Sequence, residues 1–386
     1  MTPIRRVLVV SHAYVDPAAR GKLRALAARG LEVTVAVPQH WRERDLGRVR
    51  TTTWERQSGV ELFPIPAGSD GDPERARFGG RALAALVRDK RPDLIQIEEE
   101  PWTKPAAQLA SLARRLAIPV TLFTWDNVGG SRPLGARWRR GRVLRRLAGL
   151  VAGSTDAAAL VRRTRPDLPV AVVSQLGVAV PTAPPHAAHE GLAIGCVGRL
   201  VPEKGVHTLL EALARNRAEA WHLVVAGDGP ERERLEAHAS RLRLAARVRW
   251  LGALPPEHIQ GLWKELDVLV VPSRASAAWA ERSGLLVAEA MAHEVAVVGA
   301  KVGALPEVIG DAGLVVPAED PAALAAALAE LGDPARHRAL AQAGRARALK
   351  HYSDDAVAEV TLRFWREIVD ESSAISRRPS AVRGDN

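Results

Sequence analysis

The sequence predicts an α/β protein built from two doubly wound units in tandem, and three observations support this fold class. The chain has 386 residues, more than one hydrophobic core usually covers, so two domains are expected. Short β-branched runs alternate with longer segments of helical period, as strands and crossover helices do in a parallel sheet. Prolines interrupt this alternation once, within residues 178–191, and it then resumes. We therefore expect two Rossmann-like domains that face each other across a central cleft.

The first unit, residues 1–180, is expected to contain a parallel sheet that is buried on both faces. Its strand candidates are apolar throughout, which is typical of strands covered by helices on both sides. They lie at residues 7–10, 33–37, 60–63, 94–97, 120–123, 149–152 and 170–173. Helical period predicts helices near residues 18–28, 81–88, 106–116, 137–147 and 157–163.

The second unit, residues 192–351, follows a linker at 181–191 and repeats the same pattern. Its expected strands lie at residues 192–197, 223–225, 248–251, 268–271, 295–298 and 313–315. Its expected helices lie near residues 206–215, 231–243, 256–263, 285–292 and 322–331. The last residues, 374–386, are rich in Ser, Arg and Pro and are expected to be a disordered tail.

Composition excludes several classes of protein. No window approaches the roughly eighteen consecutive apolar residues that a membrane span needs, so neither a transmembrane nor a secreted protein is expected. Cys196 is the only cysteine, so no internal disulfide and no cysteine metal cluster can form. Ordinary apolar and charged fractions argue against a disordered chain. We expect a cytoplasmic globular protein.

The net charge of +10 is unevenly distributed between the two units. Residues 1–180 carry 30 Lys and Arg against 17 Asp and Glu, a net of +13, whereas the remainder has 24 against 27, a net of −3. Seven arginines lie in the fifteen residues from Arg132 to Arg146. As a helix, this segment is a footprint for anionic lipid headgroups or an anionic acceptor, or it is a solvated basic face, and the sequence leaves these interpretations open.

In an open parallel sheet the ligand lies beyond the carboxyl ends of the strands, so the loops leaving those strands are the candidates for chemistry. The loop at residues 197–205 is the first of them. Gly198 lets the backbone approach a ligand closely, and Arg199 and Lys204 stand beside a helix N-terminus that already favours anions. A diphosphate fits this pattern, and two solvated charges at a helix start are the alternative.

Two further loops leave strands of the same sheet. The turn at residues 225–230 contains Gly229 and is weak evidence alone, because any tight strand-to-helix turn uses such residues. The loop after residue 272 enters an apolar helix near Gly284, and Glu289 lies inside that helix. A carboxylate there needs a partner, since burying it alone costs several kcal/mol, roughly. That partner is a structural arginine or a pair of ribose hydroxyls.

These loops resemble the nucleotide-sugar-binding half of the retaining glycosyltransferases of family 4, which have the GT-B fold. Glu281 and Glu289 have the E-x7-E spacing of that family. Four more motifs occur in the family's order: Gly198-Arg199, Glu203-Lys204-Gly205, Gly227-Asp228-Gly229-Pro230 and Gly303-Ala304-Leu305-Pro306-Glu307. The resemblance covers residues 192–332 closely and the whole chain in architecture.

The resemblance implies a role for each matching residue. Arg199 and Lys204 would hold the donor diphosphate and, with Glu281 at the donor sugar, would form the catalytic set. Glu289 would bind the ribose. The remaining donor-binding positions would be Gly198, Gly229, Leu251 at the base, and Ser283, Gly284 and Leu285, whose N–H groups face the sugar or phosphate. A nucleoside-diphosphate sugar would be the co-substrate, with no tightly bound cofactor or metal, and residues 352–373 would form a helix that crosses back onto the first domain.

The chain also departs from the family pattern. Arg282-Ser283 stands where Gly-Phe is frequent, so the choice of donor sugar cannot be transferred. Glu294 stands where a glycine usually caps the helix, a left-handed position that costs a non-glycine residue about 1 kcal/mol. Residues 11–22 replace a paired-glycine loop, and there Arg20 and Lys22 either serve the phosphates or are solvated helix charges.

The first unit contains the candidates for the acceptor pocket. Glu98-Glu99-Glu100 and Trp102 follow one expected strand, and Asp126 follows another. Consecutive carboxylates repel one another, which implies cationic neighbours or a cationic or polyhydroxylated ligand. We assign acceptor binding to His12, Glu99, Trp102 and Asp126, with a solvated loop as the alternative. Asp70-Gly71-Asp72 has the spacing of a metal-binding motif of another fold, and we attribute it to chance.

The sequence therefore predicts a retaining glycosyltransferase that moves a hexose-type sugar to a hydroxyl of an unidentified acceptor, either a natural product or an envelope glycan or lipid. A nucleotide-sugar isomerase or phosphorylase on the same scaffold is the alternative. A nucleic-acid-binding protein is disfavoured, because the sequence lacks aromatic residues interleaved on a positive groove and the motifs lie in the acidic half. An NAD-type oxidoreductase is disfavoured too, because no G-x-G-x-x-G follows the first strand of either unit. Peripheral contact with the inner membrane face stays an open alternative.

Overall fold

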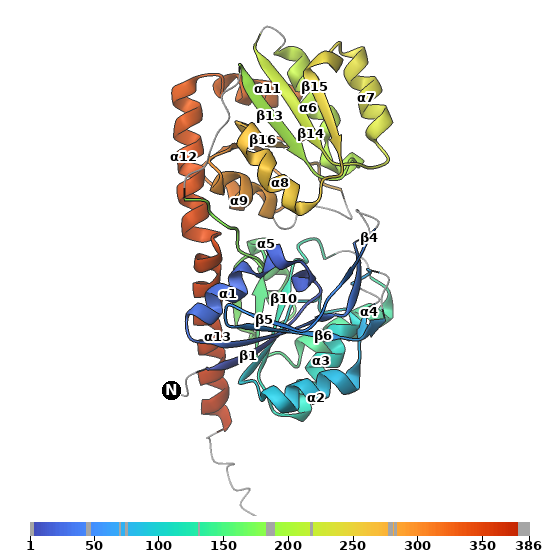
Figure 1. Ribbon diagram of the computed structural model, residues 1–386, viewed down its shortest axis with the longest axis vertical. Coiled ribbons are helices and arrows are strands. Elements are labelled where there is room, and N and C mark those ends of the chain that lie inside the picture. Colours follow the sequence, from blue (N-terminus) through green and yellow to red (C-terminus); the bar gives the residue numbers. More distant parts are fainter. Residues whose placement is uncertain are drawn as a thin grey trace, which may run out of the picture.

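The computed structural model describes residues 4–43, 48–68, 71–73, 76–129, 132–182, 190–216, 219–276, 281 and 284–376. Two α/β domains follow one another along the long axis of the molecule, and a pair of C-terminal helices runs beside both of them (Figure 1). In the described part of the chain, no helix has the length and apolar character needed to cross a membrane.

The sheet of the first domain has eight strands in the order β12-β11-β10-β9-β1-β2-β6-β5. Neighbouring strands are parallel except for β5, which pairs antiparallel with β6 at one edge. The strands are β1 (Arg6–Val10), β2 (Glu32–Pro38), β5 (Glu55–Gln57), β6 (Val60–Ile65), β9 (Leu94–Ile97), β10 (Val120–Thr124), β11 (Gly149–Ala152) and β12 (Val170–Val172). Two hairpins stand apart from this sheet, β3 (His40–Glu43) with β4 (Arg48–Thr51) and β7 (Ala67–Gly68) with β8 (Arg77–Phe78).

The sheet of the second domain has six parallel strands in the order β15-β14-β13-β16-β17-β18. Their bounds are β13 (Leu192–Val197), β14 (Trp221–Ala226), β15 (Val248–Gly252), β16 (Val268–Val271), β17 (Ala296–Ala300) and β18 (Leu314–Val316). The central strands are buried along their length, as the continuous apolar runs predicted.

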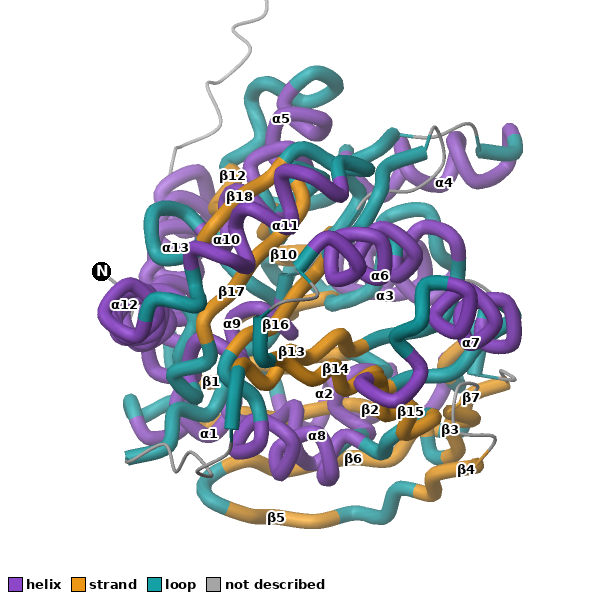
Figure 2. Tube along the Cα trace, turned by 90° about the horizontal axis from the view of Figure 1, so that it is seen from above, coloured by secondary structure: helices purple, strands orange, loops and turns teal. Residues whose placement is uncertain are grey.

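Helices cover both faces of each sheet, so each domain has two apolar cores. The first domain carries α1 (Gly21–Ala28), α2 (Gly80–Lys90), α3 (Lys104–Arg115), α4 (Leu134–Leu144) and α5 (Thr155–Arg162). The second carries α6 (Val206–Arg215), α7 (Arg232–Arg241), α8 (Pro256–Leu262), α9 (Leu285–Ala292), α10 (Leu305–Ile309) and α11 (Pro321–Glu330). Figure 2 shows this layering from above.

Strand order reverses once in each sheet, between β1 and β9 in the first and between β13 and β16 in the second. The two loops at such a switch point leave toward opposite faces of the sheet, so a crevice opens at the carboxyl ends of the strands. The loops that follow β1, β9, β13 and β16 are therefore where a ligand site is expected. All four contain residues that the sequence analysis selected.

The chain passes between the domains twice, and the two passages pair with each other. Val178 N donates to Tyr352 O at 2.8 Å, and Asp354 N donates to Val178 O at 3.2 Å. The helices α12 (Pro334–His351) and α13 (Asp354–Ser376) then run down one side of the molecule (Figure 1). Trp365 of α13 is buried in the first domain and donates to Gln96 Oε1 at 3.1 Å.

The expected fold class is confirmed, including the final helix, which packs on α1 of the first domain. All predicted strands exist, with ends shifted by no more than two residues. The hairpins and the helices α10 and α12 were not predicted. Glu294 has a φ of 59°, so it occupies the left-handed position where the family usually has glycine. Helix α13 continues to Ser376, so the expected tail is helical over its first three residues, and residues 377–386 lie outside the described part.

Candidate functional site

Two glycine turns pack backbone against backbone at the carboxyl ends of β13 and β14. Gly227 N donates to Gly252 O at 2.7 Å, and a Cβ on Gly227 would lie 1.8 Å from Gly198 O. A Cβ on Gly229 would lie 2.5 Å from Leu200 O. A larger residue would clash with the backbone at either position, so steric contact explains why both residues are glycine. The turns bring the loop of Gly198 and Arg199 to the switch point of the second sheet.

Lys204 and Glu281, which the sequence analysis assigned to separate parts of a donor, are in direct contact. Lys204 Nζ lies 2.6 Å from Glu281 Oε2, and Ser273 Oγ donates to the same oxygen at 3.1 Å. Lys204 follows β13, whereas Ser273 follows β16, so the contact spans the switch point. Both charged side chains remain partly exposed. The charge of the lysine is therefore balanced by a carboxylate at the switch point.

The backbone of Glu281 is held by residues from both domains. Its carbonyl oxygen accepts from Ala304 N at 3.0 Å and from Asn127 Nδ2 at 3.1 Å. A Cβ on Gly303 would lie 2.1 Å from that oxygen, so only glycine allows this approach. Asn127 belongs to the loop after β10 in the first domain. Sequence reasoning did not select it, because a polar loop residue carries no local sign of a partner 154 positions away.

Glu289 has neither the structural arginine nor any other partner among the described residues. It lies in the helix α9, which begins after Gly284 with a φ of 54° and is apolar around Glu289. Burial raises the pKa of Glu289 from 4.5 to about 7. The sequence left two partners open, a structural arginine or a pair of ribose hydroxyls. The described residues contain no such arginine. The carboxylate is partly exposed and free to accept hydrogen bonds from a ligand.

The other predicted donor-side residues have differing surroundings. Arg199 is exposed at the strand end and its side chain contacts no carboxylate among the described residues. Leu251 on β15 is half-buried against the core beneath α8 and α9, as is Leu285 at the start of α9. Ser283, with Arg282, lies outside the described residues.

His12 and Glu99 form a pair at the switch point of the first sheet. His12 N donates to Glu99 Oε1 at 2.9 Å, and its Nδ1 lies 2.8 Å from the same oxygen. Burial alone would lower the pKa of His12, but the charge and hydrogen bond of Glu99 outweigh it, so the pKa is raised. The imidazole also stacks on Trp41 of β3, with ring centroids 4.7 Å apart. Glu99 Oε2 is buried and has no hydrogen-bond partner among the described residues.

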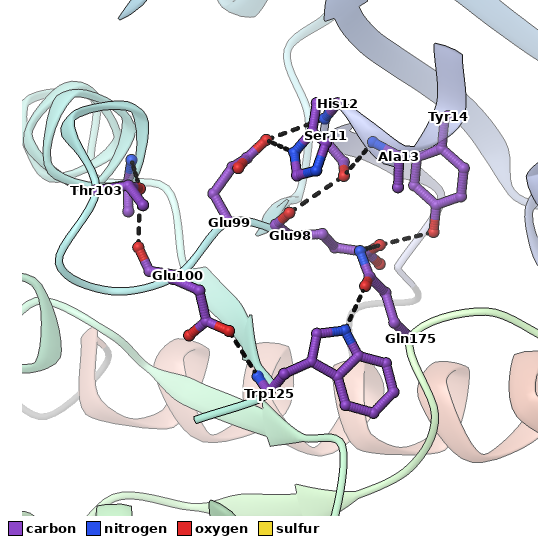
Figure 3. Close-up of polar contacts among 11 residues, drawn as sticks. Ser11, His12, Ala13, Tyr14, Glu98, Glu99, Glu100, Thr103, Trp125 and Gln175 are labelled. Atoms are coloured by element: carbon purple, nitrogen blue, oxygen red, sulfur yellow. Dashed lines mark hydrogen bonds and ion pairs between the residues drawn. The ribbon is translucent and has the colours of Figure 1, made fainter. Parts of the chain in front are cut away.

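The other two carboxylates of the triplet are used inside the protein (Figure 3). Glu98 Oε2 accepts from Tyr14 at 2.7 Å, and Glu98 Oε1 lies 2.6 Å from the buried Lys22 Nζ. Glu100 accepts from Thr124 Oγ1 at 2.6 Å and from Trp125 N at 2.9 Å. The sequence predicted either cationic neighbours or a ligand for the three consecutive carboxylates. The cationic Lys22 accounts for Glu98.

The suggestion that Arg20 and Lys22 serve the phosphates is wrong, and so is its alternative of solvated charges. Both side chains are buried. Arg20 Nε donates to Tyr14 O at 2.7 Å and its guanidinium pairs with Glu55, while Lys22 pairs with Glu98. Unpaired burial of either cation would cost several kcal/mol, roughly, so these pairs hold the loop after β1 in place.

Asp126 and Trp102 are joined through one arginine. Arg132 NH2 donates to Asp126 Oδ1 at 3.1 Å, and its guanidinium lies 3.2 Å from the centroid of the Trp102 ring. Trp102 is buried, so the arginine covers the ring face that an acceptor would need. Asp126 also accepts from Gly129 N at 3.3 Å. Both residues lie at the strand ends as predicted, and the partner that they share is the half-buried Arg132.

A second contact joins the domains beside the first. Thr155 N and Thr155 Oγ1, at the start of α5, donate to Glu307 Oε2 at 2.9 and 2.8 Å. Glu307 lies in the first turn of α10, directly after the Gly303 turn that holds Glu281. A carboxylate at a helix N-terminus is stabilised by the free N–H groups there. The sequence marked Glu307 as part of a motif but offered no partner for it.

Comparison with known families assigns both halves of the chain. The family described as "Glycosyl transferase 4-like domain" matches residues 15–175, and the family described as "Glycosyl transferases group 1" matches residues 191–333. Together these matches cover more than half of the chain.

Two curated relatives illustrate the similarity. A 2-deoxystreptamine N-acetyl-D-glucosaminyltransferase from Streptomyces fradiae is 30% identical over 321 residues, which is 76% of this chain and 75% of the relative. A GDP-mannose-dependent α-(1-6)-phosphatidylinositol monomannoside mannosyltransferase from Mycolicibacterium smegmatis is 35% identical over 164 residues, 41% of this chain and 43% of the relative. The chain thus matches three quarters of the first and under half of the second.

Solved structures share the fold at low identity. A sucrose-phosphate synthase from Thermosynechococcus elongatus superposes with a TM-score of 0.73 at 20% identity, over 95% of this chain and all of the other. The Anabaena protein HepE, in complex with UDP and glucose, superposes with a TM-score of 0.65 at 17% identity, over 94% of this chain and all of the other.

We predict that Glu289→Gln changes the pH dependence of folding stability. A carboxyl group with a folded pKa near 7 and an unfolded value near 4.5 binds more protons when folded, so its ionisation destabilises the fold as pH rises through this window. The variant should match the wild type near pH 4 and be more stable above pH 8, by about 3 kcal/mol. Chemical denaturation at both pH values measures this. Glu203→Gln, on the loop before α6, is the matched control, and identical pH profiles for wild type and Glu289→Gln would refute the prediction.

Proposed function

This chain belongs to the group 1 glycosyltransferases, family 4, with the GT-B fold, and we propose that it moves a hexose from a nucleoside-diphosphate sugar to a hydroxyl of a polyhydroxylated acceptor with retention of configuration. It is a nucleotide-sugar-dependent glycosyltransferase. The sugar, the acceptor class and the roles of individual residues are the proposed part.

One observation carries this proposal: at Glu281 the switch point of the second sheet meets the loop after β10 of the first domain. The carboxylate of Glu281 contacts Lys204 and Ser273 of the second domain, and its carbonyl accepts from Asn127 of the first. An enzyme that joins a bound donor to a bound acceptor needs the two sites within reach of each other. The Asn127 contact supports such a meeting point.

We assign the donor diphosphate to Lys204, Arg199 and the start of α9. When the bond between the anomeric carbon and the β-phosphate oxygen breaks, negative charge grows on that phosphate. Lys204 then exchanges its contact with Glu281 for the phosphate, and the exposed Arg199 supplies a second cation. The N–H groups near Gly284 and Leu285 add donors at a helix N-terminus. Glu281, released from the lysine, accepts from hydroxyls of the donor sugar.

We assign the ribose of the donor to Glu289, and the base to the surroundings of Leu251. The raised pKa of Glu289 means that its charged form gains most from new hydrogen bonds, and two ribose hydroxyls are suitable donors. In the transfer step the acceptor hydroxyl oxygen bonds to the anomeric carbon on the face that the phosphate leaves. Its proton passes to the departing phosphate oxygen, so charge and atoms balance without a further reactant.

We assign acceptor binding to the cluster of His12, Glu99 and Asp126. Within the described part of the chain, Glu99 Oε2 and Asn127 Oδ1 are buried acceptors without hydrogen-bond partners, and they follow the neighbouring strands β9 and β10. Unpaired acceptors call for a ligand that donates, which means hydroxyl or ammonium groups. The Streptomyces fradiae relative is named for 2-deoxystreptamine, a ring compound with both groups, which agrees with this class of acceptor. Trp102 contributes through Arg132 rather than through its covered ring.

We place the reaction in the cytoplasm, with peripheral contact to the inner membrane face through Arg132 to Arg146 as part of the proposal. The Mycolicibacterium smegmatis relative is named for a phosphatidylinositol acceptor, so a lipid-borne polyol is compatible with the family. A free and a lipid-borne ring present the same hydroxyls to Glu99.

A thermal-shift screen of nucleoside diphosphates and their sugars tests the proposal as a whole. The correct donor should stabilise the folded protein by mass action, and the sugar should be transferred only when an acceptor is added. Turnover of the nucleotide sugar without any acceptor would instead indicate an isomerase or a phosphorylase. No stabilisation by any nucleotide would overturn the donor site.

We predict that Lys204→Ala and Arg199→Ala each lower kcat/KM for the donor about tenfold or more. Each charge-assisted contact to the phosphate is worth roughly 1.5 to 3 kcal/mol, which corresponds to one or two decades in rate. Lys264→Ala removes an exposed lysine of the same domain and serves as the control. Near-wild-type activity in both site variants would exclude this donor assignment.

We predict that Glu99→Gln raises the acceptor KM about tenfold or more, while nucleotide binding is unchanged. The amide keeps the shape of the carboxylate but loses its charge and one acceptor position. Steady-state kinetics with each substrate varied in turn, together with the nucleotide-induced thermal shift, separates the two effects. An equal loss for donor and acceptor would mean that Glu99 only supports the fold.

A further inference from the structure

The end of α3 and the helix α4 carry arginines that no carboxylate balances. Five of them form no ion pair among the described residues: Arg114, Arg115, Arg142, Arg145 and Arg146. Burial lowers the pKa of Arg146, and the charges of the other four lower it further, which means that the five lie close together. Arg146, two residues past the end of α4, also donates to Ser111 Oγ of α3. Like charges gathered without counter-ions create a strong positive field.

Several arginines elsewhere on the surface are paired with carboxylates, whereas these five are not within the described part of the chain. Arg232 Nε lies 2.9 Å from Glu236, and Arg249 lies 2.5 Å from Glu265. Arg336 contacts Glu330 at 2.5 Å. The five arginines at the end of α3 and around α4 lack such partners among the described residues and lie close together.

Large apolar side chains are exposed within the same surface. Leu134 is 80% exposed and Trp138 is 61% exposed, and they lie four residues apart, so they share one side of α4. Arg142 follows one turn later, with its guanidinium 5.1 Å from the centroid of the Trp138 ring. Leu116, at the end of α3, is 36% exposed. Apolar residues flanked by arginines on an outer helix are typical of binding at a membrane interface.

This surface adjoins the acceptor side of the site. Helix α4 lies at the edge of the molecule in both views (Figures 1 and 2). It follows the loop that carries Asp126, and Arg139 Nε donates to Trp102 O at 2.8 Å. A partner bound at α4 would therefore lie next to the acceptor cluster.

We infer that the surface formed by Arg114, Arg115, Leu116, Leu134, Trp138, Arg142 and Arg145 docks on an anionic lipid bilayer. A bilayer of this kind accepts both features, since headgroups neutralise the arginines while Leu134 and Trp138 enter the boundary with the acyl chains. A nucleic acid would bind the arginines, but it would leave the exposed Leu116 and Leu134 without an apolar contact. This inference extends the proposed lipid contact and rests on it, but it concerns binding, which can be measured without donor or acceptor.

Co-sedimentation of the full chain with vesicles tests the inference. At about 0.1 M salt the protein should sediment with vesicles of phosphatidylcholine mixed with phosphatidylglycerol, and not with phosphatidylcholine alone. The double variant Arg142→Ala and Arg145→Ala should bind the anionic vesicles about ten- to thirtyfold more weakly. Arg363→Ala with Arg366→Ala, on α13, loses the same charge on another surface and should bind like the wild type. Leu134→Ser with Trp138→Ala should weaken binding even at high salt.

Several results would overturn the inference. Equal partitioning to both kinds of vesicle would exclude charge recognition, and an equal loss in the α4 and α13 double variants would exclude this surface. Binding to an RNA oligomer that is tighter than vesicle binding and insensitive to Leu134→Ser with Trp138→Ala would assign the surface to a polynucleotide. None of these results affects the sugar-transfer proposal, which is measured with nucleotide sugars in the absence of vesicles.

Discussion

A single carbonyl oxygen, that of Glu281, accepts hydrogen bonds from both domains, and much of the candidate site depends on this position. Ala304 N binds it from the second domain and Asn127 Nδ2 from the first, while Gly303 leaves room for the approach. With its backbone fixed, Glu281 presents its carboxylate to Lys204 at the switch point of the second sheet. The contact between Thr155 and Glu307 lies beside it and holds the same loop region. Loops of both domains therefore meet at this one oxygen.

The two domains manage charge in different ways. The second is acidic overall, and at its switch point Lys204 is balanced by a carboxylate while Arg199 is exposed. Glu289 has no side-chain partner in the described part of the chain, and burial raises its pKa. The first domain carries the positive surplus. Its buried cations Lys22 and Arg20 pair with Glu98 and Glu55, and a cluster of arginines without ion pairs among the described residues lies at the end of α3 and around α4. The net charge of the whole chain thus says little about the nucleotide and more about the partner of the first domain.

Local sequence patterns were sufficient for the strands and for the glycine turns, because continuous apolar runs and steric demands are properties of a few neighbouring residues. The same is true of Glu289, whose apolar neighbours marked it as a carboxylate in need of a partner. Long-range pairing could not be predicted in this way. Lys22 is buried because Glu98 lies beside it, 76 positions away, and Asn127 matters because Glu281 does. Helix α12 was missed because its arginines and alanines lack a clear apolar stripe, and the hairpins because their strands are short and polar.

The central claim, that the two halves of the site meet at Glu281, is tested most directly by Asn127→Ala. With the donor identified, nucleotide binding is measured by calorimetry and sugar transfer by steady-state kinetics in the same variant. The account predicts unchanged nucleotide affinity and a transfer rate reduced about tenfold, because one hydrogen bond between the domains is lost while Lys204 and Ser273 stay in place. Unchanged transfer, or a parallel loss of nucleotide binding, would contradict it.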